Sequence, residues 1–202
     1  MATRIAAFIT SKMLALSVIE EDDRELYCYG YFLLITRFFF FLVTAITGFL
    51  AGVLLESVVF YGMFMLLRTY AGGVHAKTER QCTVLTTITL SASILGIKVM
   101  GQILSMLVPL AMLAFGSISI ALLSPLDTQE KPLDESEKKH YRLICLILVA
   151  LCIISAMISR LLRLNTVYYP IVASVFLEGV LLCIGKVVSY QKIHTINFSN
   201  HQ

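Results

Sequence analysis

One short polar stretch, residues 68–82, carries the two side chains best suited to chemistry, His75 and Cys82. A thiol attacks a carbonyl efficiently only as a thiolate, and a neighbouring imidazole can take up its proton. The two residues are seven positions apart, so a continuous helix would separate them by about 10 Å along its axis. Direct proton transfer needs about 3 Å between the heavy atoms. The pair can therefore act together only if the backbone between the two residues is not helical.

The residues around the pair predict such a break. The Gly72-Gly73 pair disfavours helix immediately before His75. The segment 78–81 has the pattern of a capping box, in which Thr78 is the N-cap of a helix. Cys82 would then lie in the first turn of that helix, where the positive end of the helix dipole favours a thiolate.

Other interpretations of the pair stay open at this point. A histidine and a cysteine at this spacing also occur by chance as ordinary structural residues. A metal site is disfavoured, because two ligands without a further His or Cys nearby leave zinc under-coordinated. The five cysteines are an odd number and contain no close CxxC pair, which argues against a disulfide framework. We expect neither a metal nor a cofactor.

The composition indicates a membrane protein. The chain is 58% hydrophobic and 14% charged, with a mean hydropathy of +0.84, whereas soluble domains average about 45–50% apolar and about 25% charged residues. Its apolar runs reach the roughly 20 residues that cross a hydrocarbon core and do not alternate as barrel strands do. We expect an all-α, polytopic integral membrane protein with six hydrophobic helical segments, at about 30–48, 50–67, 82–100, 102–124, 142–160 and 166–189.

The polar segments complete this topology. The 202 residues are expected to form a single membrane-embedded domain, 1–202, with an amphipathic helix within 1–28 that lies in the membrane interface and a cytoplasmic loop at 125–141. Lys and Arg gather in the N-terminal segment, in the loops after the second and fourth spans and in the C-terminal tail, which places both termini in the cytoplasm. Arg160 and Arg163 lie between the fifth and sixth segments, which this topology places outside the cell, against the preference of Lys and Arg for the cytoplasmic side. The net charge of +3 suits a lipid bilayer and gives no indication of nucleic-acid binding.

Charged residues inside the apolar runs suggest a different class of function. Glu56 and Glu178 lie within the second and sixth runs, and Lys98 lies at the end of the third. Ionisable groups in membranes are costly and often functional. A small transporter or exporter without peptidase activity, with these side chains along its path, is therefore the alternative to an enzyme. A scaffold that only binds a peptide is a third hypothesis.

Two motifs resemble those of a known family. Arg68, Gly72-Gly73, His75-Ala76 and Cys82 form the pattern R-x-x-x-G-G-x-H-A-x-x-x-x-x-C, which is similar to the signature of the accessory gene regulator B (AgrB) family. About fifty residues later, the segment 125–133 resembles the second motif of that family, a P-x-D-T-x-x-K-P-like run. Length, hydropathy and the amphipathic N-terminal segment match as well, so the resemblance covers essentially the whole chain.

The resemblance implies a specific activity. Members are cysteine endopeptidases of the bacterial cell membrane that cut the C-terminal part from a quorum-sensing propeptide at the cytoplasmic face. The cut leaves a thioester on the enzyme, and a Cys or Ser of the propeptide then closes a thiolactone or lactone ring. Carried onto this chain, Cys82 is the nucleophile and His75 the general base and then the acid. The partner is an AgrD-like propeptide, and the resemblance also implies a homodimer.

The other matched residues receive supporting roles from the same resemblance. Arg68 is expected to pair with a substrate carboxylate, and the Gly72-Gly73 pair to allow the turn that brings His75 to Cys82. The side chains expected to contact the propeptide are Asp127, Thr128, Lys131 and Pro132. Which residue orients His75 stays open, with Glu79 and Asp127 as candidates by polarity.

Overall fold

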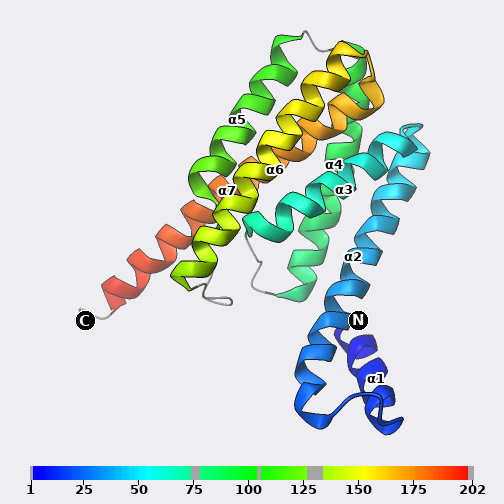
Figure 1. The fold of residues 1–202 in the computed structure, drawn as a ribbon, viewed down its shortest axis with the longest axis vertical. Coiled ribbons are helices and arrows are strands. Elements are labelled where there is room, and N and C mark those ends of the chain that lie inside the picture. The colour runs from blue at the N-terminus through cyan, green and yellow to red at the C-terminus, as the bar shows by residue number, and fades with distance from the viewer. Residues whose placement is uncertain (1, 74–77, 104–105, 127–133, 200–202) are drawn as a thin grey trace.

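The computed structural model describes residues 2–73, 78–103, 106–126 and 134–199, and within these ranges the chain is helical and contains no strand (Figure 1). A short amphipathic helix and a turn of 3-10 helix, Glu21–Asp23, precede the long helices. The α-helices are α1 (Ala2–Ala15), α2 (Arg24–Ala51), α3 (Leu54–Ala71), α4 (Glu79–Ile103), α5 (Leu107–Leu123), α6 (Glu135–Leu161) and α7 (Asn165–Ser199).

The helices confirm an all-α, multi-pass membrane protein. Five of them, α2, α3, α4, α6 and α7, are long and apolar enough to cross a membrane, and α5 is an apolar helix of 17 residues. Large apolar side chains such as Leu50, Leu151 and Met157 are exposed on their outer faces. Lipid tails are the solvent in which such a surface is stable.

The helix ends show which predicted boundaries are correct. Gly48 and Gly52 of the sequence predict a turn between the first two spans, because their 37 residues are too many for one ordinary crossing. The turn is confirmed, since α2 ends at Ala51 and Gly52 follows with a left-handed φ of +73°.

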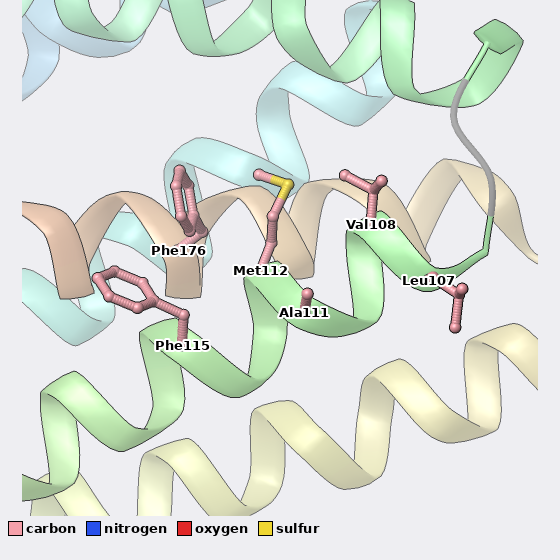
Figure 2. Close-up of a pocket in the computed structure, with 6 residues that line it drawn as sticks. All are labelled: Leu107, Val108, Ala111, Met112, Phe115 and Phe176. Carbon is pink, nitrogen blue, oxygen red and sulfur yellow. The ribbon is translucent and has the colours of Figure 1, made fainter.

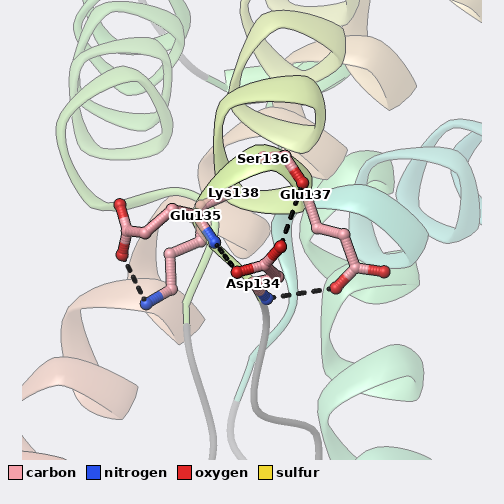
Figure 3. A network of polar contacts seen from close by, with 5 residues as sticks. All are labelled: Asp134, Glu135, Ser136, Glu137 and Lys138. Atoms are coloured by element: carbon pink, nitrogen blue, oxygen red, sulfur yellow. Dashed lines mark hydrogen bonds and ion pairs between the residues drawn. The ribbon is translucent and has the colours of Figure 1, made fainter.

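The predicted loop at 125–141 is too long, because α6 already begins at Glu135. Asp134 and Glu137 form a capping box there: the Asp134 carboxylate accepts from the Glu135 amide at 2.8 Å, and Glu137 accepts from the Asp134 amide (Figure 3). This cap starts the helix about two turns before the apolar run does.

Helix α7 is the centre of the bundle. Half of its apolar window is buried, compared with 17–33% for the other spans. One core cluster joins α7 to α3, α5 and α6 around Leu67, Ile120 and Val175. A second cluster joins it to α2, α3 and α4 around Phe60, Ile94 and Ala173. Side chains on α7 are therefore in a position to affect most of the protein.

The polar connections gather at one end of the bundle. In Figure 1 the end of α3, the start of α4, the end of α5, the start of α6 and the end of α7 all lie toward the lower side, where α1 packs beside α2. The turn between α2 and α3 and that between α6 and α7 lie at the other end. The segments rich in Lys and Arg thus share one side, as the six predicted crossings require. Which side faces the cytoplasm stays a prediction.

Helices α5 and α7 cross at two glycines. A Cβ on Gly116 would lie 2.4 Å from the carbonyl oxygen of Val175, and a Cβ on Gly179 would lie 2.7 Å from the Gly116 Cα. The backbones of the two helices are therefore nearly in contact. Small residues allow this close approach, which gains packing energy where lipid supplies no hydrophobic driving force.

We predict that Gly116→Ala lowers the free energy of unfolding by about 1–3 kcal/mol, because the added methyl group must push α7 away from α5. The matched control is Gly96→Ala in α4, where no described atom lies within 4 Å of the added Cβ. That change should be neutral or slightly stabilising, because alanine favours helix. Thermal unfolding in lipid nanodiscs measures both, and equal stability of the two variants would contradict the predicted contact.

Candidate active site

The end of α3 is a turn built from two glycines. Helix α3 stops at Ala71, Gly72 has φ of +79° and Gly73 has φ of +154°. Residues that carry a Cβ are strained at positive φ, whereas glycine adopts it readily. The predicted break after the second span is confirmed at this position.

Arg68 holds the turn from within α3. Its guanidinium Nη1 donates a hydrogen bond of 3.0 Å to the Gly72 carbonyl oxygen. The same group lies against the next residue, since a Cβ on Gly73 would be only 1.5 Å from Nη1. Gly73 is therefore required by close approach as well as by its conformation.

Arg68 also faces a buried acid that the sequence analysis did not connect with it. Its Nη1 lies 3.6 Å from Glu178 Oε1, and the Glu178 side chain is completely buried in α7. We expected Arg68 to pair with a substrate carboxylate, and here the carboxylate that it faces belongs to the protein. The sequence carries part of this signal, because Glu178 is an acid inside an apolar run and such acids often pair with a base. It does not indicate which base is the partner.

The first part of the second motif lies against the same turn. The Leu126 amide donates a hydrogen bond of 2.9 Å to the Ala71 carbonyl oxygen, and a Cβ on Gly72 would lie 2.9 Å from the Leu126 carbonyl oxygen. Two motifs about fifty residues apart in sequence thus meet through their backbones. The rest of the second motif, with Asp127, Thr128, Lys131 and Pro132, lies outside the described residues, and the roles of these side chains stay predictions.

Cys82 lies in the first turn of α4, as the capping pattern predicts. The Thr78 hydroxyl oxygen accepts a hydrogen bond of 3.3 Å from the Gln81 amide, and the Cys82 amide donates to the Thr78 carbonyl oxygen at 3.0 Å. The Cys82 side chain is partly exposed. The first turn of a helix carries a partial positive charge from its aligned peptide dipoles, so the sulfur lies where a negative charge is stabilised.

His75 lies outside the described residues, so its distance to Cys82 stays a prediction. The residues on either side of this segment are described: Gly73 belongs to the turn held by Arg68, and Thr78 caps α4. Sequence reasoning thus found the two structures that flank His75.

The amphipathic helix α1 borders this region. The Thr3 hydroxyl donates a hydrogen bond of 2.9 Å to Glu79 Oε2, so the start of α1 contacts the first turn of α4. Ala6 and Thr10 of α1 are buried, while Ile5 and Phe8 on the same helix are exposed. An amphipathic helix with exposed apolar side chains suits the membrane interface, and its contact with Glu79 places it beside the candidate nucleophile.

An apolar groove elsewhere in the bundle does not have the groups for catalysis. Its lining contains neither a nucleophile nor a titratable side chain, and Figure 2 shows it between α5 and α7: Leu107, Val108, Ala111, Met112, Phe115 and Phe176. Leu107 begins α5, at the end of the bundle opposite the start of α4 (Figure 1). The candidate active site is therefore the polar end around Arg68 and Cys82.

Comparisons with known proteins show the family to which the chain is related. A family model described as accessory gene regulator B matches residues 2–183. A Clostridium perfringens protein named "Putative AgrB-like protein" (strain SM101) is 26% identical over 145 residues, which cover 69% of this chain and 67% of the relative. "Putative AgrB-like protein 2" of Clostridium perfringens strain 13 is 24% identical over 146 residues, with the same coverage. No solved structure matches the chain significantly.

We predict that Gly73→Ala disturbs the turn, because the added methyl group would overlap the Arg68 guanidinium. The expected loss is about 1–3 kcal/mol of unfolding free energy, together with faster hydrogen exchange at the Leu126 amide. The control is Gly62→Ala on α3, where no described atom lies within 4 Å of the new Cβ. Unchanged exchange and stability in Gly73→Ala would show that the turn does not depend on this contact.

Proposed function

Because the chain belongs to the accessory gene regulator B family, whose members take part in processing quorum-sensing peptides, we propose that it is a membrane cysteine endopeptidase. Its substrate is an AgrD-like propeptide, which it cuts at the cytoplasmic face of the bacterial cell membrane. The observation that carries the proposal is the position of Cys82. It lies in the capped first turn of α4, seven residues after His75, at the polar end of the bundle.

The proposed reaction begins with proton transfer from Cys82 to His75. The thiolate attacks the scissile carbonyl carbon, and His75 returns the proton to the leaving amine as the C–N bond breaks. The N-terminal part of the propeptide is then held on the Cys82 sulfur as a thioester. A Cys or Ser side chain of the propeptide attacks the same carbonyl, which closes a thiolactone or lactone ring and releases the Cys82 thiol.

The location of the site supports ring closure over hydrolysis. Water competes with the propeptide side chain for the thioester, and hydrolysis would give a linear product. A site at the membrane edge limits the access of water and holds the internal nucleophile close to the carbonyl. The partly exposed Cys82 and the adjacent amphipathic helix α1 fit a peptide substrate that arrives along the membrane surface.

The charges at this end of the bundle support a cytoplasmic orientation of the site. Lys12 in α1, Arg80 in α4 and Lys138 and Arg142 in α6 all lie near the polar connections. Positive residues in short loops favour the cytoplasmic side, which is where a newly synthesised propeptide would be found. A homodimer stays a prediction from the family resemblance.

The transporter alternative has less support than the enzyme. It requires Glu178, Glu56 and Lys98 along one path, but the Glu178 carboxylate is fully buried and faces Arg68. Lys98 is exposed on α4. Because Glu178 already faces Arg68 inside the protein, its carboxylate is not available to bind a transported solute.

We predict that the protein in nanodiscs, incubated with the peptide encoded by the small reading frame next to its gene, gains the mass of the acyl fragment. Cys82→Ala removes the nucleophile and His75→Ala removes the base, so both should lower the rate of product formation at least about 10³-fold. Intact mass spectrometry measures adduct and products.

The control for this experiment is Cys28→Ala, which removes another partly exposed thiol from α2 and should keep adduct and product. An intact peptide without any adduct on the wild-type protein would refute the peptidase. Unchanged activity in Cys82→Ala would assign the chemistry to another residue.

A further inference from the structure

A fully buried carboxylate in the central helix faces the guanidinium that holds the Gly72-Gly73 turn. We propose that Glu178 is a positioning residue: by fixing Arg68 it holds the turn from which the chain continues to His75. This inference rests on the proposed function, because it assigns Glu178 a part in the same peptidase reaction. It adds a residue more than ninety positions after Cys82 to the working site.

The burial of Glu178 requires an explanation. Its side chain is 0% exposed in α7, and neither carboxylate oxygen has a hydrogen-bond partner among the described residues. Removing a carboxylate from water is costly unless a positive charge compensates it. The described group that compensates it is the Arg68 guanidinium, with Nη1 at 3.6 Å from Oε1.

Arg68 passes this constraint to the turn. The same Nη1 atom that faces Glu178 donates to the Gly72 carbonyl oxygen at 3.0 Å and occupies the space that a Cβ on Gly73 would need. One nitrogen therefore links a side chain of α7 to the backbone at the end of α3. A guanidinium can serve both contacts in a fixed geometry because it is planar and carries several donors.

A second contact makes the position of the turn sensitive to this link. The amide of Leu126, which follows α5, donates a hydrogen bond to the Ala71 carbonyl oxygen, next to the two glycines. The turn thus lies between the α5–α6 connection and the Arg68–Glu178 pair. If the charge on Glu178 is removed, the Arg68 guanidinium loses the group that fixes its position against the turn. The hydrogen bond between Leu126 and Ala71 can remain.

A purely structural ion pair would stabilise the packing of α3 on α7 without affecting the chemistry. The two roles differ in what a neutral, isosteric replacement does. A positioning role predicts that Glu178→Gln slows catalysis while peptide binding is retained. A structural role predicts that stability falls and that the remaining folded enzyme works at the normal rate.

The test compares Glu178→Gln with wild type in nanodiscs, with the same peptide assay. We expect kcat to fall about 100-fold, as for a catalytic group displaced by about 1 Å, with KM unchanged within about twofold. The matched control is Glu56→Gln, which neutralises another intramembrane acid in the first turn of α3, at the far end from Arg68. It should keep normal kcat.

A second readout needs no substrate. The rate at which iodoacetamide alkylates Cys82, followed at the peptide level by mass, reports the thiolate that His75 generates. We expect wild-type Cys82 to react faster than Cys28, and Glu178→Gln to reduce this rate to that of His75→Ala. Wild-type Cys82 reacting no faster than Cys28 would refute the proposed function. A fast wild-type rate that Glu178→Gln leaves unchanged would refute the positioning role alone.

Arg68→Lys covers the case in which Glu178→Gln does not fold. Lysine keeps a positive charge opposite Glu178 but cannot reproduce the planar guanidinium contacts to the turn. A folded Arg68→Lys protein with the same loss of kcat and of Cys82 reactivity supports the proposal. Normal kcat in this variant, or failure of both variants to fold, would show that the pair serves folding rather than positioning.

Discussion

The structure depends on one constraint: backbone polar groups near lipid must be satisfied by the protein itself. A bundle of helices meets this condition everywhere except where a helix stops. The turn after α3 is such a place, and the chemistry proposed for this protein requires it. Its carbonyl groups are satisfied from two directions, by the Arg68 guanidinium at Gly72 and by the Leu126 amide at Ala71. The break in the helix is thus tolerated because neighbouring elements replace its missing hydrogen bonds.

This solution explains why α7 is the most buried helix. The guanidinium that supports the turn brings a positive charge into an apolar bundle, and Glu178 supplies the opposite charge from α7. A carboxylate is tolerated there only if α7 is shielded from lipid by other helices. The contact at Gly116 and Gly179 brings α5 close on one side, and α3, α4 and α6 cover the rest. Packing of the bundle and support of the turn are therefore parts of the same arrangement.

Much of this could be predicted from the sequence, because the signals are local. The apolar runs predict the helices, Gly52 and the Gly72-Gly73 pair predict their ends, and Thr78 predicts the start of α4. The predicted start of the fifth span, at about residue 142, is too late, since hydropathy marks where lipid begins and not where the capping box at Asp134 begins the helix.

The pairing of Arg68 with Glu178 was out of reach for a different reason. The two residues are 110 positions apart, and only the packing of α3 on α7 brings them together. Sequence reasoning therefore identified the residues that carry the proposed reaction more readily than those that hold them in place. A nucleophile needs a local environment, such as the end of a helix, which a few neighbouring residues specify. The geometry of a turn depends on contacts from distant segments, and in a membrane bundle an internal charge pair is one of the few polar contacts that can span two helices. Isolated charges within apolar runs or at their ends are therefore the places to look for positioning residues when the catalytic motif is already known.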